Sequence, residues 1–299
     1  MQALIAGAGP AGCHLAIRLA RSGWRVTLAD PLPDPRRNAY SSGALPLRDA
    51  NRLCIPQACR SAHWWGWQLL NPAGVEHQWW SDDALGVVLD FAAFRSWLWG
   101  EAVQAGVELL PGRRVRLLRL DADSAVVRIQ ANGEASEERV CSHLVDATGA
   151  RRVLLRQAGV EFDSPEDPLL SGEGSEWLLQ GNDRTTARWR DRLSFMLGSQ
   201  WIPHGYGWVF PMGDHQLKVG ICRLAPPTGP RASINTALKR LLNRFGLDQL
   251  PVLDRHGGLV SSTVNRRETY GSGVLRAVGD SASTANLLGG EGIRHAMDS

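Results

Sequence analysis

Two glycine-rich segments at opposite ends of the chain have the residue types and spacing that chemistry at a phosphate-bearing cofactor needs. Residues 7–12 read GAGPAG, residues 279–282 read GDSA, and residues 289–292 read GGEG. The first segment alone is typical of a dinucleotide-binding turn. Because the second lies near the C-terminus, the pair favours FAD held between the two ends of one fold, and with it flavin redox chemistry.

The elements around residues 7–12 follow the order that such a turn requires. Residues 3–6 form a short apolar run that suits a buried parallel strand. Residues 13–21 then have the pattern of a helix that Gly23 would close, and residues 25–29 suit a second strand. Strand, tight turn, helix and strand make up the nucleotide-binding unit of a Rossmann fold.

Each glycine of the turn has its own expected role. Gly7 allows the turn, Gly9 lets the backbone approach a pyrophosphate, and Gly12 lets helix and strand pack closely. The helix N-terminus would offer free N–H groups to the phosphates. We therefore expect six residues of the turn to bind the cofactor: Gly7, Ala8, Gly9, Pro10, Ala11 and Gly12.

Asp30 stands at the end of the second strand, where a carboxylate can accept hydrogen bonds from the adenosine ribose hydroxyls. A carboxylate there would also repel a 2′-phosphate, so NADP is not expected in this pocket. The alternative is a glycine-rich turn that binds no ligand.

Composition agrees with an enzyme and argues against several other classes. At 299 residues the chain can bury a large core, and its net charge of +3 gives no electrostatic case for nucleic acid. The five cysteines show no C-x-x-C spacing, so neither a disulfide framework nor a metal site is indicated. No signal peptide and no run of about 18 apolar residues is readable, so a cytoplasmic protein is expected, with peripheral membrane contact left open.

The middle of the chain indicates helices that pack against the cofactor-binding unit. Asp90 is placed to cap a helix over residues 91–104, which Gly106 would end before a strand over residues 107–110. The expected apolar stripe of this helix consists of Phe94, Trp97, Leu98 and Val103. A second amphipathic helix is expected over residues 233–244 and suits packing rather than chemistry.

Strands are expected between these two helices. Residues 113–120 and 125–130 suggest an antiparallel meander, with a turn signal at residues 132–133. Residues 143–145 lead into residues 146–149, which read DATG. This segment suits a buried strand that breaks into a glycine turn, a geometry that lets the backbone pass close to a cofactor.

A second region, over about residues 62–88 and 162–224, is rich in tryptophan and in strand-like alternation. Residues 205–211 and 217–221 look like a hairpin that turns at residues 213–214. The aromatic side chains could line a pocket for a large apolar substrate, or form cross-strand pairs that hold a sheet together, and the second interpretation is favoured for most of them. The side chains expected in the substrate pocket are Trp65, Tyr206, Trp208 and Phe210.

In chain order, GAGPAG, DATG, GYGWVFP and GDSASTANLLGGEGI resemble the motifs of FAD-dependent oxidoreductases. The greatest resemblance is to the geranylgeranyl reductases and lycopene cyclases, and aromatic-ring hydroxylases are more distant. The resemblance spans nearly the whole chain and implies a mixed α/β fold, in which a Rossmann-type FAD domain like that of glutathione reductase carries an inserted antiparallel substrate sheet. The expected FAD domain covers residues 1–61, 89–160 and 256–299, and the substrate domain covers residues 62–88 and 161–255.

The same resemblance implies how the second glycine segment would hold a flavin. Asp280 would bind the ribityl chain, and the turn over residues 289–293 would place backbone N–H groups against the flavin N1/O2 edge. The expected cofactor-binding residues of this part are Gly279, Asp280, Gly290, Glu291, Gly292 and Ile293. FAD is the expected cofactor, with NADPH or NADH as a candidate transient reductant.

The chain departs from these families at several positions. Leu287 stands where they usually have proline, and Phe91 stands where the central helix usually opens with arginine or a polar residue. The loop over residues 38–43 lacks the cysteine that geranylgeranyl reductases often carry, and the acidic motif of plant-type lycopene cyclases is not visible. No lysine lies between Met1 and Leu217, which argues against the tryptophan halogenases.

The sequence stops at Ser299, inside the helix that Gly292 should begin, whereas the resembling families continue this helix. We therefore expect the FAD domain to be cut short, in a fragment or in a reduced member of the group. As written, the flavin-binding helix would have only about two turns.

The expected function is that of an FAD-dependent oxidoreductase acting on a hydrophobic, isoprenoid- or carotenoid-like small molecule, of reductase or cyclase type. The alternatives are a flavin monooxygenase that hydroxylates an aromatic substrate, and a truncated flavin-binding protein without catalysis. Glu291 is the candidate catalytic acid, and capping of a helix is at least as good an interpretation of it. The sequence does not indicate the electron donor, the oligomeric state or the exact substrate.

Overall fold

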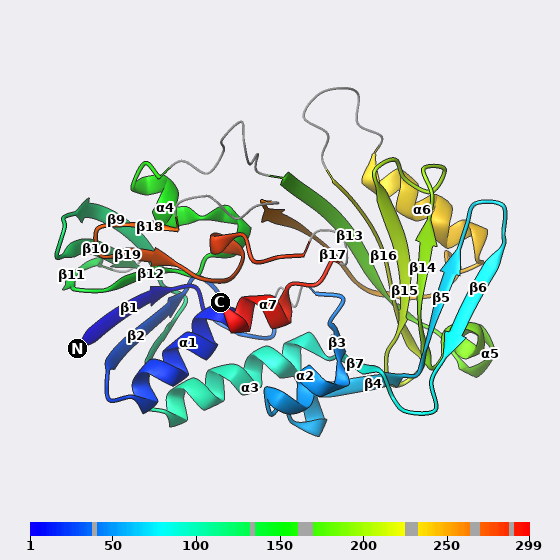
Figure 1. The fold of residues 1–299 in the computed structure, drawn as a ribbon, viewed down its shortest axis with the longest axis horizontal. Helices are drawn as coiled ribbons and strands as arrows, with labels where there is room; N and C mark the ends of the chain where they lie inside the picture. The colour runs from blue at the N-terminus through cyan, green and yellow to red at the C-terminus, as the bar shows by residue number, and fades with distance from the viewer. Residues whose placement is uncertain (38–40, 132–134, 161–169, 225–232, 264–269, 287–289) are drawn as a thin grey trace. The chain divides into compact units, whose positions relative to one another are not determined.

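The computed structural model describes residues 1–37, 41–131, 135–160, 170–224, 233–263, 270–286 and 290–299 (Figure 1). The chain divides into two compact units, each assembled from segments that are distant in the sequence. Unit 1 comprises Met1–Ala39, Arg95–Leu170 and Val260–Ser299, and unit 2 comprises Tyr40–Phe94 and Ser171–Leu259.

Unit 1 is built on a six-stranded sheet with the order β18-β19-β12-β1-β2-β8. Its strands are β1 (Gln2–Ala6), β2 (Arg25–Asp30), β8 (Glu108–Pro111), β12 (Leu144–Asp146), β18 (Gly271–Ser272) and β19 (Leu275–Ala277). β1 pairs in parallel with both β2 and β12, and only β18 adds an antiparallel pair among the pairs described. Four of the five residues of β1 are buried, as expected for a central parallel strand. The predicted Rossmann-type unit is confirmed.

Two long helices, α1 (Pro10–Arg21) in unit 1 and α3 (Phe91–Gln104) with its residues from Arg95 on in unit 1, follow the sequence pattern closely. α1 connects β1 to β2 and starts three residues earlier than the periodicity indicated, because Pro10 suits the first position of a helix. α3 has the expected bounds, and its N-terminus is capped by Asp90, whose Oδ1 accepts a hydrogen bond from the N–H of Ala93.

The buried stripe of α3 differs from the expected one. Val103 is 56% exposed, whereas Trp99 and Ala102 are buried together with Phe94 and Leu98. The stripe therefore continues at a spacing of four residues from Leu98 to Ala102. The apolar character of Val103 misled the prediction, because a single valine at the end of a helix is easily left in solvent.

The other described elements of unit 1 are an antiparallel meander and four short helical segments. The meander contains β9 (Arg114–Leu120) and β10 (Ala125–Gln130), as predicted, and adds β11 (Glu137–Cys141), which the sequence analysis did not name. The turn expected at residues 132–133 lies outside the described residues. The helical segments are the 3₁₀ turns at Gly149–Arg151 and Gly279–Ala282, α4 (Val153–Gln157) and α7 (Ile293–Asp298).

Unit 2 contains a seven-stranded sheet with the order β17-β13-β16-β15-β14-β5-β6. Its strands are β5 (Gly66–Leu70), β6 (Glu76–Trp80), β13 (Leu170–Gln180), β14 (Arg192–Leu197), β15 (Gly205–Pro211), β16 (Gln216–Leu224) and β17 (Val252–Ser262). β15 and β16 form the predicted hairpin. The expected all-antiparallel sheet needs one correction, because β14 and β5 pair in parallel. These two strands are far apart in the chain, so no hairpin turn fixes their relative direction.

A second sheet of unit 2 joins β3 (Ala44–Pro46), β7 (Gly86–Leu89) and β4 (Arg60–Trp64), and α2 (Leu47–Arg52) follows β3. Both outer strands pair antiparallel with β7. The ladder hydrogen bonds of β3 and β4 therefore hold residues 41–61 in unit 2, whereas the sequence had assigned them to the FAD domain. Residues 89–94 and 256–259 also fall in unit 2.

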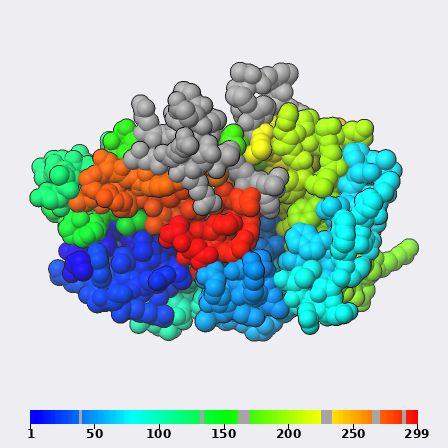
Figure 2. All heavy atoms as spheres, in the orientation of Figure 1, coloured from blue at the N-terminus to red at the C-terminus, as the bar shows by residue number. Residues whose placement is uncertain are grey.

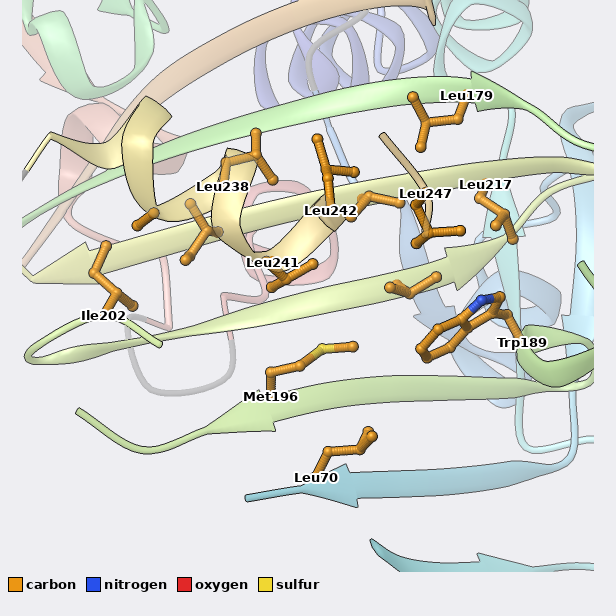
Figure 3. Close-up of a cluster of buried hydrophobic side chains, with 14 residues drawn as sticks. Leu70, Leu179, Trp189, Met196, Ile202, Leu217, Leu238, Leu241, Leu242 and Leu247 are labelled. Atoms are coloured by element: carbon orange, nitrogen blue, oxygen red, sulfur yellow. The ribbon is translucent and has the colours of Figure 1, made fainter. Parts of the chain in front are cut away.

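The main core of unit 2 lies between the long sheet and α6 (Ile234–Arg244), as Figure 3 shows. Leu238, Leu241 and Leu242 of α6 pack against buried side chains of the sheet that include Met196 and Leu217. Ser233 caps the helix by accepting a hydrogen bond from the N–H of Thr236. The helix predicted over residues 233–244 is thus confirmed as a packing element. The short α5 (Asp183–Thr186) lies elsewhere in this unit.

The hairpin of β5 and β6 forms one edge of the long sheet and lies at the molecular surface (Figure 2, in cyan). Trp79 and Trp80 of β6 are 52% and 53% exposed. These two tryptophans therefore do not belong to a buried pocket. Within the described residues, no helix is long and apolar enough to cross a membrane.

Candidate functional site

The turn between β1 and α1 requires glycine at two positions. Gly7 has φ of +106°, and a Cβ atom there would overlap the carbonyl oxygen of Ala147. A Cβ atom on Gly12 would overlap the carbonyl oxygen of Gly7. The tight turn and the close packing of helix on strand, both predicted from the sequence, are therefore confirmed.

Gly9 differs from its two neighbouring glycines. Among the described residues, no atom lies within 4 Å of a Cβ atom added there, and its φ of −78° is accessible to any residue. Gly9 is the N-cap of α1, whose first turn has neither a side-chain cap nor an acidic residue. Open space beside uncapped N–H groups is what a bound pyrophosphate needs, and this role of Gly9 stays a prediction.

The backbone of Ala8 is held on both sides. Its N–H donates to Asp30 Oδ2 over 2.7 Å, and its carbonyl accepts hydrogen bonds from Trp99 Nε1 at 2.9 Å and Cys13 Sγ at 3.3 Å. The N–H of Leu32 donates to the other oxygen of Asp30, Oδ1, over 2.9 Å. Asp30 thus orders the turn itself, while its expected contact with a ribose stays a prediction. The sequence analysis did not identify the contact of Trp99 with this turn, because a tryptophan within a helix matches no cofactor-binding motif.

Two opposite charges act on this turn. Burial raises the pKa of the Cys13 thiol, the negative charge of Asp30 raises it further, and the positive charge of Arg95 lowers it. Arg95 is only 6% exposed and donates from Nη1 to the carbonyl oxygen of Arg37 over 2.9 Å. The sequence indicated that Phe91 replaces a polar residue at the start of this helix, and Arg95 lies one helical turn further along.

The second glycine segment meets the first one within unit 1. Gly279 has φ of +62°, and a Cβ atom there would lie 2.8 Å from the Cβ of Ala11 in α1. Gly290 also has a positive φ, of +64°, and a Cβ atom on Gly292 would lie 4.0 Å from Asp280 Oδ1. The structure therefore brings the two end segments together. Leu287 and Gly289 lie outside the described residues.

Asp280 is a half-buried acid in this second segment. Burial raises its pKa to about 6, and the positive charge of Arg152 works in the opposite direction. No hydrogen bond to the Asp280 carboxylate is found within the described part of the chain. Arg152 is fully buried, has φ of +47°, and donates a short hydrogen bond to Ser283 Oγ. No sequence motif pointed to Arg152.

The DATG turn serves first as a structural junction. Asp146 is fully buried, and its Oδ2 accepts hydrogen bonds from the N–H groups of Leu154 and Leu155 at 2.8 and 2.9 Å. Its Oδ1 accepts from the N–H of Thr148 at 2.9 Å. Because the carbonyl of Ala147 lies against Gly7, this turn passes next to the first glycine segment. Its expected approach to a cofactor stays a prediction.

Glu291 is engaged in an ion pair. Its Oε1 accepts from Arg294 Nε at 2.8 Å, and its Oε2 accepts from Arg294 Nη2 at 2.6 Å. The N-cap of α7 is Gly292, and no side chain caps this helix. The capping interpretation of Glu291 is therefore wrong, because its carboxylate reaches forward to the first turn of the helix instead. To act as a catalytic acid, Glu291 would first have to break its ion pair with Arg294.

Three of the four expected pocket residues share one face of β15. Tyr206, Trp208 and Phe210 alternate along the strand, with ring centroids 5.9 and 6.3 Å apart. Phe195 of β14 joins them, 5.9 Å from Tyr206 and 5.3 Å from Phe210. We call these four side chains the aromatic face. The face opposite to it packs against α6, because Val209 belongs to that core.

Trp65 lies apart from the aromatic face. It is half-buried in the connection between β4 and β5, and it lines a shallow surface depression with Trp80 and Asp191. Its nearest ring neighbour described is His63, at 6.0 Å between centroids. A role in substrate binding stays a prediction for all four residues. Among the described residues, no group of three or more His, Cys, Asp and Glu side chains could hold a metal ion.

A match to a known protein family covers most of the chain. The family described as FAD dependent oxidoreductase matches residues 47–287. The chain belongs to this family. The protein is therefore an FAD-dependent oxidoreductase, as the paired glycine segments indicated.

Two curated relatives match nearly the full length of this oxidoreductase. A digeranylgeranylglycerophospholipid reductase from Methanopyrus kandleri is 30% identical over 98% of this chain and 76% of its own length. Another from Methanococcoides burtonii is 27% identical over 99% of this chain and 71% of its own length. The resemblance to geranylgeranyl reductases is confirmed.

A solved structure confirms the fold. A geranylgeranyl bacteriochlorophyll reductase-like protein from Thermoplasma acidophilum matches with a TM-score of 0.85 at 22% identity. The match covers 99% of this chain and 75% of the other. At this identity the likeness concerns the fold alone.

Proposed function

We propose that this FAD-dependent oxidoreductase reduces carbon–carbon double bonds in the isoprenoid chains of a lipid. The observation that carries the proposal is the full-length relationship to reductases named for a digeranylgeranyl glycerophospholipid. The aromatic face of unit 2 supports it, because a long apolar chain needs shape and aromatic surface rather than a clamp of charges.

The residues of unit 1 fit an FAD in three ways. Gly9 leaves open space beside the uncapped N-terminus of α1, which suits a pyrophosphate. The half-buried carboxylate of Asp280 can accept hydrogen bonds from ribityl hydroxyls. Asp30 keeps lone pairs for the adenosine ribose beyond the two N–H groups that it already binds.

The remaining members of the proposed FAD site come from the same two segments. We assign them as Gly7, Ala8, Pro10, Ala11, Gly12, Gly279, Gly290, Glu291, Gly292 and Ile293. Arg95 adds a buried positive charge near the first turn and would balance the charge of the pyrophosphate.

The bound flavin would supply the hydride for the reduction, and NADPH or NADH would supply the electrons to it. The protein's own part is to orient the lipid and to exclude water from the reacting bond. Tyr206, Trp208 and Phe210 would provide the apolar wall, with Trp65 nearer the surface. Because such a lipid resides in a membrane, we infer peripheral contact with a membrane surface.

The test uses the purified, flavin-loaded protein under anaerobic conditions. NADPH or dithionite reduces the flavin, and the reduced protein is then mixed with digeranylgeranylglycerophospholipid in detergent micelles or with a small phenolic acid. We expect the lipid to reoxidise the flavin and to lose double bonds by mass spectrometry, and the phenolic acid to do neither. Rapid reoxidation that needs a phenolic acid and oxygen would instead identify a hydroxylase and exclude this proposal.

A further inference from the structure

Two turns of unit 1 are joined by side-chain hydrogen bonds. The first is the 3₁₀ turn at Gly149–Arg151 with Arg152 after it, and the second is the 3₁₀ turn at Gly279–Ala282 with Ser283 after it. Ser281 Oγ donates to the carbonyl oxygen of Gly149 over 2.9 Å, and Arg152 Nη2 donates to Ser283 Oγ. Both contacts therefore engage the turn that carries Asp280.

Arg152 and Ser283 share a backbone conformation in which glycine is usual. Each ends its 3₁₀ turn in the left-handed region, with φ of +47° at Arg152 and +55° at Ser283. A residue with a side chain persists in this conformation only when its surroundings hold it there. The hydrogen bond from Arg152 is the described contact of the Ser283 side chain, and it therefore supports this conformation.

The charge of Arg152 acts on the same turn. Its guanidinium is fully buried and stays protonated, and its positive charge opposes the burial that raises the pKa of Asp280 to about 6. The elements that pack against this turn bring further titratable or charged groups, which include Asp146, His14, Glu291, Arg294, His295 and Asp298. Arg152 is nevertheless the described charge that acts on the Asp280 carboxyl.

The turn also presents polar atoms that the protein itself does not satisfy. Thr284 follows Ser283 and is buried, yet its Oγ1 has no hydrogen-bond partner among the described residues. The Asp280 carboxylate likewise accepts no hydrogen bond within the described ranges. Buried polar groups normally have partners, so these atoms suit a ligand that brings hydroxyl groups, as the ribityl chain of FAD does.

We propose that Arg152 is a positioning residue of the FAD site. It holds Ser283 in the left-handed conformation, and it offsets the negative charge of Asp280 so that this residue receives the ribityl hydroxyls as a carboxylate. Because its side chain is fully buried and donates to Ser283, Arg152 acts through the turn and needs no contact with FAD. The inference rests on the assignment of Asp280 in the proposed function. It does not depend on the lipid substrate, because flavin binding alone tests it.

The pH dependence of flavin retention, followed by ultrafiltration and flavin fluorescence, tests the charge. Wild-type protein should release flavin as pH falls through about 6. Without the positive charge the Asp280 carboxyl gains its proton at higher pH, so Arg152→Met should release flavin at a pH about one unit higher. Arg151→Met is the matched control, because the neighbouring Arg151 is exposed. It should keep the wild-type midpoint, and a wild-type midpoint in Arg152→Met would overturn the proposal.

Variants of Ser283 test the conformation while they keep the charge of Arg152. Ser283→Ala has no hydroxyl for Arg152 to hold, so the free turn should relax and FAD should bind at least about 10-fold more weakly. Ser283→Gly adopts the left-handed conformation freely and should bind FAD within about twofold of wild type. Titration of the apoproteins with FAD measures both. Equal affinities would overturn the proposal, and this comparison decides the question if Arg152→Met does not fold.

Asp280→Asn separates failure of this inference from failure of the FAD assignment. If Asp280→Asn keeps its flavin and still releases it near pH 6, Asp280 does not bind the ribityl chain, and the role of Arg152 is overturned with that assignment. If Asp280→Asn loses the pH step while Arg152→Met keeps the wild-type midpoint, the role of Arg152 alone is overturned. Loss of the step in Asp280→Asn together with a raised midpoint in Arg152→Met is the expected result.

Discussion

The carboxylate of Asp30 accepts a hydrogen bond from the N–H of Ala8 over 2.7 Å, which ties the end of β2 to the first glycine turn. A second N–H, that of Leu32, donates to the other oxygen. An acid placed to bind a ribose is therefore also a support of the turn that would hold the phosphates. Variants of Asp30 must be examined for stability as well as for cofactor affinity.

Asp30→Ala should destabilise the protein without FAD by about 1.5–3 kcal/mol, because a buried charged acceptor with two N–H partners is removed. FAD affinity should fall by a similar free energy if the ribose contact exists. Urea unfolding of the apoprotein and flavin titration measure the two effects separately. Asp34→Ala is the control, since Asp34 accepts from the N–H of Arg36 in a surface turn. Lost stability with unchanged FAD affinity would leave Asp30 with its structural role only.

Gly9→Ala should lower flavin content, whereas Gly12→Ala should lower the stability of the fold. A methyl group on Gly12 would overlap the Gly7 carbonyl, so this variant should lose about 1–3 kcal/mol of stability even without cofactor. A methyl group on Gly9 meets no described atom within 4 Å, so the apoprotein should fold normally. It should nevertheless lose flavin, because the methyl group fills the space assigned to the pyrophosphate. Thermal unfolding and flavin content give the contrast, and full flavin content in Gly9→Ala would contradict the assignment.

Asp280→Asn should stabilise the apoprotein while weakening FAD binding. The pKa of Asp280 is raised to about 6 in the folded state, so the charged form is destabilised there above that pH. Removing the charge should add roughly 2–3 kcal/mol of apoprotein stability near neutral pH. The lost charge-assisted hydrogen bond should lower FAD affinity about 10–100-fold.

The pH dependence of flavin retention checks the same residue. Wild-type protein should release flavin as pH falls through about 6, where Asp280 becomes protonated, and Asp280→Asn should lack this step. Ultrafiltration followed by flavin fluorescence measures the retained cofactor. The exposed His204 supplies the control variant His204→Ala, which should behave as wild type. Equal flavin content in Asp280→Asn and His204→Ala would refute the ribityl assignment.

His256 should make stability depend on pH in a defined direction. Because its folded pKa is raised, its ion pair with Glu176 contributes fully below the unfolded pKa of about 6.5 and is lost as pH rises through the folded value. His256→Asn should therefore lower the melting temperature at pH 6, and the deficit should narrow at higher pH. His204→Asn is a suitable control, because His204 is exposed and its φ of +58° is tolerated by asparagine. A deficit that is constant with pH would show that His256 contributes packing alone.

The sequence by itself determined the local elements and the cofactor class. The GAGPAG turn, the α3 bounds and the β15–β16 hairpin could be predicted because each depends on residues close in the chain: glycine freedom, an Asp90 cap, and alternation about a turn. The paired glycine segments likewise indicated FAD, because two glycine-rich turns at opposite ends of the chain suit a long cofactor that both ends hold.

Only the tertiary structure decided which distant residues act together. Trp99 donates a hydrogen bond to the carbonyl of Ala8, and the charge of Arg152 acts on Asp280. His256 lies between Asp254 and Glu176. Each of these contacts joins segments that no local sequence pattern relates. The placement of residues 41–61 in unit 2 had the same origin, since β3 and β4 both pair with β7. Ladder pairing and the burial of charge are settled by the whole fold, because their free energies depend on neighbours that the chain brings together only when it is folded.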